Sequence, residues 1–278
     1  MKTLSASLDI TPNTSVLLNA SVQKAPILSG LWTFDIRLGG ETLSPVGRWT
    51  ITCKHKERGC DYLEMDLPLD EGYRLQRCLL VNHNNQLLLL GDAVLADEDS
   101  PGSLSYRAEF SVSPTLRAKI TDAATEIDFR PVRRTASRTA PSAFRVLPLA
   151  LPEWRTAKQA GLVSGTLAET NGTLVLQQET TGQSLFAPLL FDLNASRLSK
   201  RYTWRQLSVG EDLQRVSEDQ AVGYRIHLGQ EQFLLYRSLT TSQANRTVLG
   251  HNLIDDFCFA RFDPKKGVDP LIAVEVIE

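Results

Sequence analysis

The sequence predicts an all-β protein: an antiparallel β-sandwich, either one large sandwich or a double (super-)sandwich, with very little helix. Short runs that alternate between apolar and polar residues recur about every 8–12 residues, with turn residues between them. Two of these runs form especially clear hairpins. Only residues 114–125, 154–160 and 210–220 permit short helices.

The first hairpin spans residues 73–90. From Tyr73 to Val81 the odd positions are mostly apolar and the even ones mostly polar, which predicts a strand with one buried face. Residues 83–85, His-Asn-Asn, predict a tight turn because Asn tolerates left-handed backbone angles. Leu87 to Leu90 follow as a short apolar run without alternation. Such a run predicts a strand buried on both faces, and hence a central one.

This hairpin resembles the β-sandwich domain of heparinase II/III-like polysaccharide lyases. In that family an Arg-bearing strand precedes a strand that ends in Asp plus a small or apolar residue. Here the segments GYRLQR and LLLLGDAV fit that description, and the resemblance covers residues 61–95. An α/α toroid ahead of the sandwich supplies most catalytic groups in the family. Nothing in this chain reads as a toroid, so the resemblance implies a fold more than an activity. The matching residues are Arg74, Arg77, Leu88, Leu90, Asp92 and Val94.

A change of composition at residues 130–143 divides the chain. This segment is rich in arginine, with Pro, Ser, Thr and Ala between, and contains no acidic residue. We predict an N-terminal sandwich half over residues 1–129, a linker over 130–143 and a C-terminal half over 144–278. The alternative is that Arg133, Arg134 and Arg138 bind sulfate, carboxylate or phosphate, since guanidinium binds such groups bidentately.

The second hairpin, residues 221–239, suggests a binding site. Alternation places Arg225 and His227 on the face opposite Tyr224 and Ile226. Arginine can neutralise the carboxylate of an acidic polysaccharide, while Tyr and His can stack on sugar rings or move protons. The alternative is that these arginines pair with Asp and Glu on a solvated face. The predicted ligand-binding residues are Tyr224, Arg225, Tyr236, Arg237, Arg246 and His251.

The four cysteines are too few for a disulfide scaffold. Cys53, His55 and Cys60 have the spacing C-x-H-x4-C around a predicted hairpin loop. This spacing suits ordinary free thiols, a disulfide across the hairpin, or part of a metal site that needs a fourth ligand. We predict free thiols, with neither a metal nor a cofactor.

Charge and hydropathy limit the partners. A formal net charge of −2 argues against a dedicated binder of nucleic acid or of an anionic membrane. No apolar run approaches the ~18–20 residues of a membrane helix, and the N-terminus lacks the apolar core of a signal peptide. The sequence as written predicts a soluble, cytoplasmic protein and carries no signal for its oligomeric state.

Three functions fit these observations. The first is non-catalytic binding of a carbohydrate, acidic polysaccharides included, or of a protein partner. The second is a polysaccharide lyase-like enzyme or a degenerate relative of one. The third is a structural or assembly protein. The first is favoured because the sequence contains no phosphate loop, nucleophile elbow, dinucleotide fingerprint or zinc-protease motif.

Overall fold

The structure, a computed structural model, describes residues 3–12, 14–97, 102–119, 125–132, 144–153, 163–241 and 245–275. The predicted all-β fold is confirmed: every strand pairing in the described part of the chain is antiparallel. The only helical segment among these residues is the 3₁₀ helix η1 (Ala195–Arg197).

The strands form four sheets, which we number in their order of stacking. In the first sheet the strand order is β1 (Leu4–Ile10), β2 (Val16–Val22), β3 (Ala25–Leu38), β9 (Leu104–Val112), β14 (Thr173–Thr180) and β13 (Val163–Thr170), with β4 (Glu41–Thr42) paired to β3. In the second it is β10 (Leu116–Lys119), β11 (Ile127–Pro131), β12 (Phe144–Pro148), β15 (Leu185–Asp192), β8 (Leu87–Ala96), β7 (Tyr73–Asn82), β6 (Cys60–Pro68) and β5 (Thr50–Glu57).

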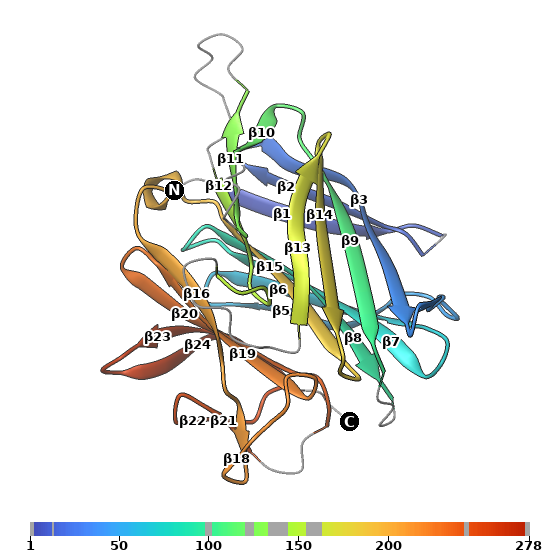
Figure 1. Ribbon diagram of the computed structural model, residues 1–278. Helices are drawn as coiled ribbons and strands as arrows, with labels where there is room; N and C mark the ends of the chain where they lie inside the picture. Colours follow the sequence, from blue (N-terminus) through green and yellow to red (C-terminus); the bar gives the residue numbers. More distant parts are fainter. Residues whose placement is uncertain are drawn as a thin grey trace.

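Two smaller sheets follow, made of residues beyond 201. The third sheet has the order β16 (Tyr202–Leu207), β19 (Ala221–Leu228), β20 (Glu231–Ser238), β23 (Phe257–Asp263) and β24 (Gly267–Val274). The fourth has the order β18 (Gln214–Arg215), β17 (Gly210–Glu211), β21 (Arg246–Val248) and β22 (His251–Leu253). In Figure 1 the first sheet lies at the right, and the third and fourth, in orange and red, lie at the lower left.

Each interface between successive sheets contains a separate apolar core. Leu88 and Leu90 belong to the core between the first and second sheets, whereas Leu87 and Leu89 belong to the core between the second and third. All four are at most 1% exposed. The prediction of a central strand buried on both faces is therefore confirmed for β8.

The prediction of one exposed face was wrong for β7. Gln76, Cys78 and Leu80 on its polar face are buried as well, with Gln76 only 7% exposed. The reason is tertiary: the third sheet packs on this face of the second sheet, and the alternation within β7 alone contains no information about that partner.

A buried ion pair within the second sheet is hydrogen-bonded to the first sheet. Arg77 on β7 and Asp92 on β8 face each other in register and form two hydrogen bonds, Nε to Oδ1 at 2.8 Å and Nη2 to Oδ2 at 2.7 Å. The third donor of Arg77, Nη1, binds the Trp32 carbonyl on β3, and Tyr106 on β9 donates to Asp92. The guanidinium also lies 3.9 Å from the centre of the Trp32 ring. Both charges are fully buried, so these contacts replace the water they lose.

Strands from both predicted halves share the first two sheets. β11 pairs with β12 across the predicted linker, and β14 pairs with β9. Residues 133–143, with Arg133, Arg134 and Arg138, lie outside the described residues. The division of the chain at 130–143 therefore stays a prediction.

Two of the helix-permissive segments contain strands instead. Residues 210–220 include the hairpin of β17 and β18, and residues 116–119 form β10. Residues 154–160 lie outside the described part. No helix among the described residues has the length and apolarity that a membrane crossing requires.

Replacing Leu88 with alanine tests the double burial of β8. The substitution should cost about 2–5 kcal/mol of unfolding free energy, because it leaves a cavity in the first core. Urea denaturation measures the change. Leu31→Ala is the matched control: Leu31 is 44% exposed on β3, so its loss should change stability by less than about 0.5 kcal/mol. Equal effects of the two substitutions would contradict the stacking.

Candidate functional site

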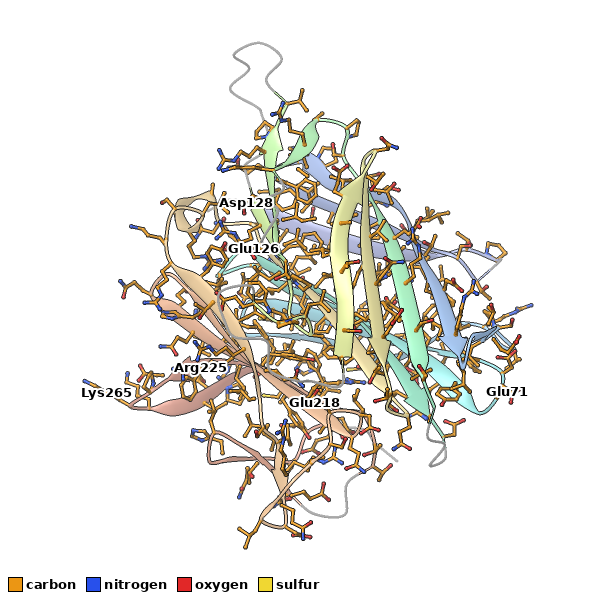
Figure 2. All side chains as sticks on the ribbon, in the orientation of Figure 1. Glu71, Glu126, Asp128, Glu218, Arg225 and Lys265 are labelled. Atoms are coloured by element: carbon orange, nitrogen blue, oxygen red, sulfur yellow. The ribbon has the colours of Figure 1, made fainter. Side chains whose placement is uncertain are left out.

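The outer face of the third sheet is only partly covered. The fourth sheet packs on the half that contains Ala221, Leu234, Tyr236, Cys258 and Ala260. Further along the strands, Arg225 and His227 of β19 are half-exposed on this same face, while Ile226 between them is buried. The predicted outward direction of Arg225 and His227 is confirmed. Figure 2 labels Arg225 on these strands, and Lys265 at the turn between β23 and β24.

The open half carries a group of polar and aromatic side chains, which we call the arginine strip. Arg225 donates to the Gln232 side chain from Nε at 3.0 Å and from Nη2 at 2.6 Å. Its guanidinium carbon lies 4.9 Å from the centre of the Phe262 ring. The His251 ring stands edge-on to the Phe262 ring, with 6.4 Å between the two ring centres. The arginine strip consists of Arg205, Arg225, His227, Gln232, His251 and Phe262.

The charges of the strip are unbalanced. Arg205 on β16 faces Arg225 on β19 directly in the strand register. Cβ atoms of facing residues lie about 4.5–5.5 Å apart, so two like charges in this position repel. Within the described part of the chain, no carboxylate forms an ion pair with either arginine. The strip is thus a local concentration of positive charge on a protein of net charge −2.

The predicted tyrosines lie in the cores. Tyr224 points toward the second sheet and Tyr236 toward the fourth, and each is 1% exposed. Burial raises the pKa of Tyr224, and the nearby Glu218 adds to the effect. Burial also raises the pKa of Tyr236, against the opposing charge of Arg246. Neither phenol can take a proton from a ligand at the surface, because both are buried and their raised pKa values keep them protonated.

Arg237 joins the second sheet to the third. Its Nη1 donates to Glu64 on β6 at 2.7 Å, and the Tyr62 hydroxyl donates to the same carboxylate oxygen. Both charged side chains are at most 4% exposed. The field of Glu64 raises the pKa of Arg237 in spite of the burial, which alone would lower it. This guanidinium is bonded within the core and does not reach the surface.

Arg246, on β21 of the fourth sheet, is hydrogen-bonded to Ser238 at the end of β20 in the third sheet. It bonds Glu211 through Nε at 2.8 Å, and Nη1 donates to the Gln220 carbonyl at 2.9 Å and to the Ser238 hydroxyl at 2.6 Å. The side chain is 3% exposed. Of the six predicted ligand-binding residues, the structure therefore brings only Arg225 and His251 together at an accessible surface.

The cysteine cluster is not assembled. Cys53 faces Glu64 across the hairpin and Cys60 faces Glu57, so the two are not cross-strand partners. All four cysteines are free thiols, which excludes the disulfide alternative. Burial raises the pKa of the Cys60 thiol to about 11, which keeps it protonated and unreactive. His55 instead lies against Glu57, with Nε2 at 3.1 Å from Oε2 of the carboxylate. Among the described residues no three His, Cys, Asp or Glu side chains gather as a metal site.

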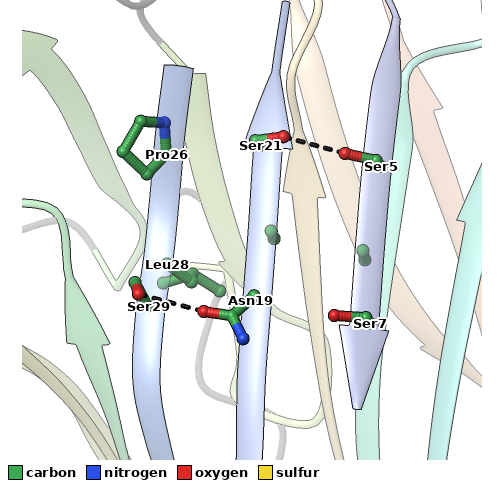
Figure 3. A pocket seen from close by; sticks show the side chains of 9 residues that line it. Ser5, Ser7, Asn19, Ser21, Pro26, Leu28 and Ser29 are labelled. Carbon is green, nitrogen blue, oxygen red and sulfur yellow. Dashed lines mark hydrogen bonds between the residues drawn. The ribbon is translucent and has the colours of Figure 1, made fainter. Parts of the chain in front are cut away.

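A shallow groove of about 190 Å³ lies on the first sheet, across β1, β2 and β3. Its lining is neutral and rich in serine. The polar side chains bond each other across the strands: Ser5 to Ser21 at 2.8 Å, and Ser29 to Asn19 at 3.0 Å (Figure 3). With no charge and with partners already in place, the groove supports a functional argument less well than the arginine strip.

Sequence reasoning missed Arg205 and Phe262. They lie on β16 and β23, which come next to Arg225 only through the pairing of β16 with β19 and the packing of Arg225 on Phe262. One local signal was available for Arg205. It follows Trp204, and a buried Trp at one position predicts an outward side chain at the next.

Comparisons with known proteins gave matches among solved structures. No protein-family model matches the sequence, and no curated protein is similar to it. Among solved structures, the chain is similar to heparan sulfate lyase HepC from Pedobacter heparinus, with a TM-score of 0.49, 9% identity, and coverage of 82% of this chain and 37% of that one. It is also similar to a heparinase III gene product, with a TM-score of 0.48, 7% identity, and coverage of 80% and 36%.

A further heparinase III structure has a TM-score of 0.48 and 9% identity, covering 80% of this chain and 35% of that one. This chain therefore spans little more than a third of the length of these structures. At such low identity the similarity concerns the fold alone.

The structural role of Arg237 is testable by denaturation. Arg237→Ala leaves Glu64 as an unpaired buried charge, so it should cost about 3–5 kcal/mol of unfolding free energy. The double variant Glu64→Gln with Arg237→Met should lose much less, since it removes both charges and keeps the volume filled. An Arg237→Ala cost below about 1 kcal/mol would show that the guanidinium is not committed to the core.

Proposed function

We propose that this chain is a non-catalytic binding module for an acidic carbohydrate, and that the ligand lies on the arginine strip. One observation carries the proposal: Arg205 and Arg225 face each other in register on an exposed face without an acidic partner among the described residues. Like charges in this arrangement destabilise the fold. A bound anion would turn the repulsion into two favourable contacts.

The geometry of Arg225 suits a carboxylate or sulfate. Gln232 accepts from Nε and Nη2, and Phe262 lies against the guanidinium, so the side chain is held before a ligand arrives. Preorganisation of this kind reduces the entropy lost on binding. The Nη1 donors are left for the ligand, and a guanidinium donates to anionic oxygens in a fixed planar geometry.

The aromatic end of the strip supports a sugar rather than a small inorganic anion. Phe262 and His251 lie edge to face beside the arginines. Together they offer an apolar surface next to a positive charge. A sugar ring with an acidic substituent has the complementary arrangement, since its C–H groups form apolar patches beside the charged group.

Binding without catalysis is favoured over a lyase reaction. A lyase must neutralise a carboxylate and remove the adjacent proton at the same place. The tyrosines proposed for the second task, Tyr224 and Tyr236, are buried in two different cores, and burial raises their pKa values. The arginine strip therefore supplies the neutralising groups without these tyrosines, and His227 and His251 are the remaining proton acceptors in it. Loss of product release in His227→Gln or His251→Gln would distinguish a lyase from a binding module.

Calorimetry with three polymers of matched length tests the proposal: a sulfated glycan, an unsulfated polyuronate and a neutral glycan. We expect the two acidic polymers to bind and the neutral one not to bind. Arg205→Gln and Arg225→Gln should each weaken binding about tenfold or more, equivalent to a loss of about 1.4 kcal/mol. Binding should also weaken with salt, because exposed charges are screened beyond about 8–10 Å at physiological ionic strength.

Arg37→Gln provides the matched control. Arg37 is also an exposed strand arginine, but it lies on the first sheet and pairs with Asp35. Its substitution should leave affinity unchanged. The proposal fails if no acidic polymer binds at low salt, or if the Arg37 variant weakens binding as much as the two strip variants. Release of unsaturated sugar, seen as ultraviolet absorbance, would establish the lyase reaction instead.

A further inference from the structure

The strand β5 stands apart from the rest of the second sheet. Seven of its eight residues are exposed, and the eighth, Cys53, is half-buried. By contrast, β7 has a single exposed residue and β8 none. The second sheet is covered on both sides along its middle, but at β5 only Cys53 packs against a neighbouring core, the one shared with the third sheet.

The backbone of β5 is paired along one edge. Within the described part of the chain, β5 pairs with β6 and with no other strand. The register shifts between Ile51 and Cys53, so Thr52 is a bulge residue without a partner in β6. The regular part of the edge is therefore the five residues Cys53 to Glu57. Unpaired N–H and C=O groups along such an edge are a template for another strand.

The charges on this edge are mainly basic. Lys54 and Lys56 alternate along one side of the strand and are exposed. Lys56 reaches Asp61 at 3.2 Å, while Lys54 has no ion pair among the described residues. Lysine on an edge strand prevents it from pairing with a copy of itself, since the like charges would meet. The complementary occupant is consequently a strand with acidic side chains.

We propose that β5 is a docking edge for an extended acidic segment of a partner protein, which adds to the second sheet as a ninth strand. Backbone hydrogen bonds to residues 53–57 would hold the segment in register. Acidic residues at every second position would then meet Lys54 and Lys56 on one face of the sheet. This site lies on the second sheet and is separate from the arginine strip on the third.

The test uses a nine-residue peptide of alternating Thr and Glu, with two controls. One control peptide has Lys in place of Glu, and the other keeps every Glu but carries N-methyl groups on alternate amides, which removes the strand-pairing donors. We expect only the unmethylated Thr-Glu peptide to bind, and hydrogen exchange to slow at those amides of residues 53–57 that point away from β6. Methylation should weaken binding at least tenfold.

Two variants locate the contact. Lys54→Glu should weaken peptide binding at least tenfold, while Lys119→Glu should not change it. Lys119 is also exposed on an edge strand of the second sheet, β10, at the opposite end of that sheet. Arg225→Gln should bind the peptide like the unaltered protein, which separates this proposal from carbohydrate binding. Equal affinity for the methylated peptide, or unchanged exchange at residues 53–57, would overturn the proposal.

Discussion

Leu87 to Leu90 direct apolar side chains to both faces of the second sheet, so this sheet is stable only with another sheet packed on each side. Each fully buried leucine stabilises the fold by about 1.5–3 kcal/mol relative to exposure. The first and third sheets supply the two covers. The stacked arrangement therefore follows from the burial of β8, and the fourth sheet extends the stack by covering half of the third.

The buried arginines fit this stack. Each interface contains an arginine bonded to a carboxylate: Arg77 with Asp92, Arg237 with Glu64, and Arg246 with Glu211. Removing two charges from water is costly, and such pairs often add little net stability compared with apolar residues. Their effect is directional, because a shifted strand would leave a buried charge without its partner. Only Arg237 and Glu64 lie on two different sheets, whereas Arg77–Asp92 lies within the second sheet and Arg246–Glu211 within the fourth. We infer that the Arg237–Glu64 pair fixes the register between its two sheets and that the other two pairs fix the pairing of strands within theirs.

The same pairs distinguish these structural arginines from the two arginines proposed to bind a ligand. Arg237 donates from Nη1 to Glu64, and Arg246 donates to Glu211 and to the Gln220 carbonyl, all inside the protein. Arg205 and Arg225 instead lie where the fourth sheet ends, on a face that solvent reaches. A fold of this kind can bind an anion on its surface without disturbing the charges that hold its layers together.

The sequence was sufficient to predict the strands and the central position of β8, because period-2 patterns and a short leucine run are local signals. The sequence also indicates which way Arg237 points, because Arg237 lies on the same face of β20 as Leu235 and Phe233, two and four residues before it, which are buried. Tyr224 likewise lies on the same face of β19 as the buried Ile226. What the sequence could not supply was the pairing of sheets. The burial of the polar face of β7, and the neighbourhood of Arg205, Arg225 and Phe262, depend on contacts between strands far apart in the chain.

The most direct measurement is a titration of the arginine side chains by nuclear magnetic resonance, following the Nε–Hε signals while a sulfated oligosaccharide is added. The signals of Arg205 and Arg225 should move together and saturate at one common affinity. Those of Arg77, Arg237 and Arg246 should stay in place, since their guanidinium groups are buried and bonded within the protein. Movement of the buried arginines, with Arg205 and Arg225 unchanged, would contradict the separation of structural from ligand-binding arginines.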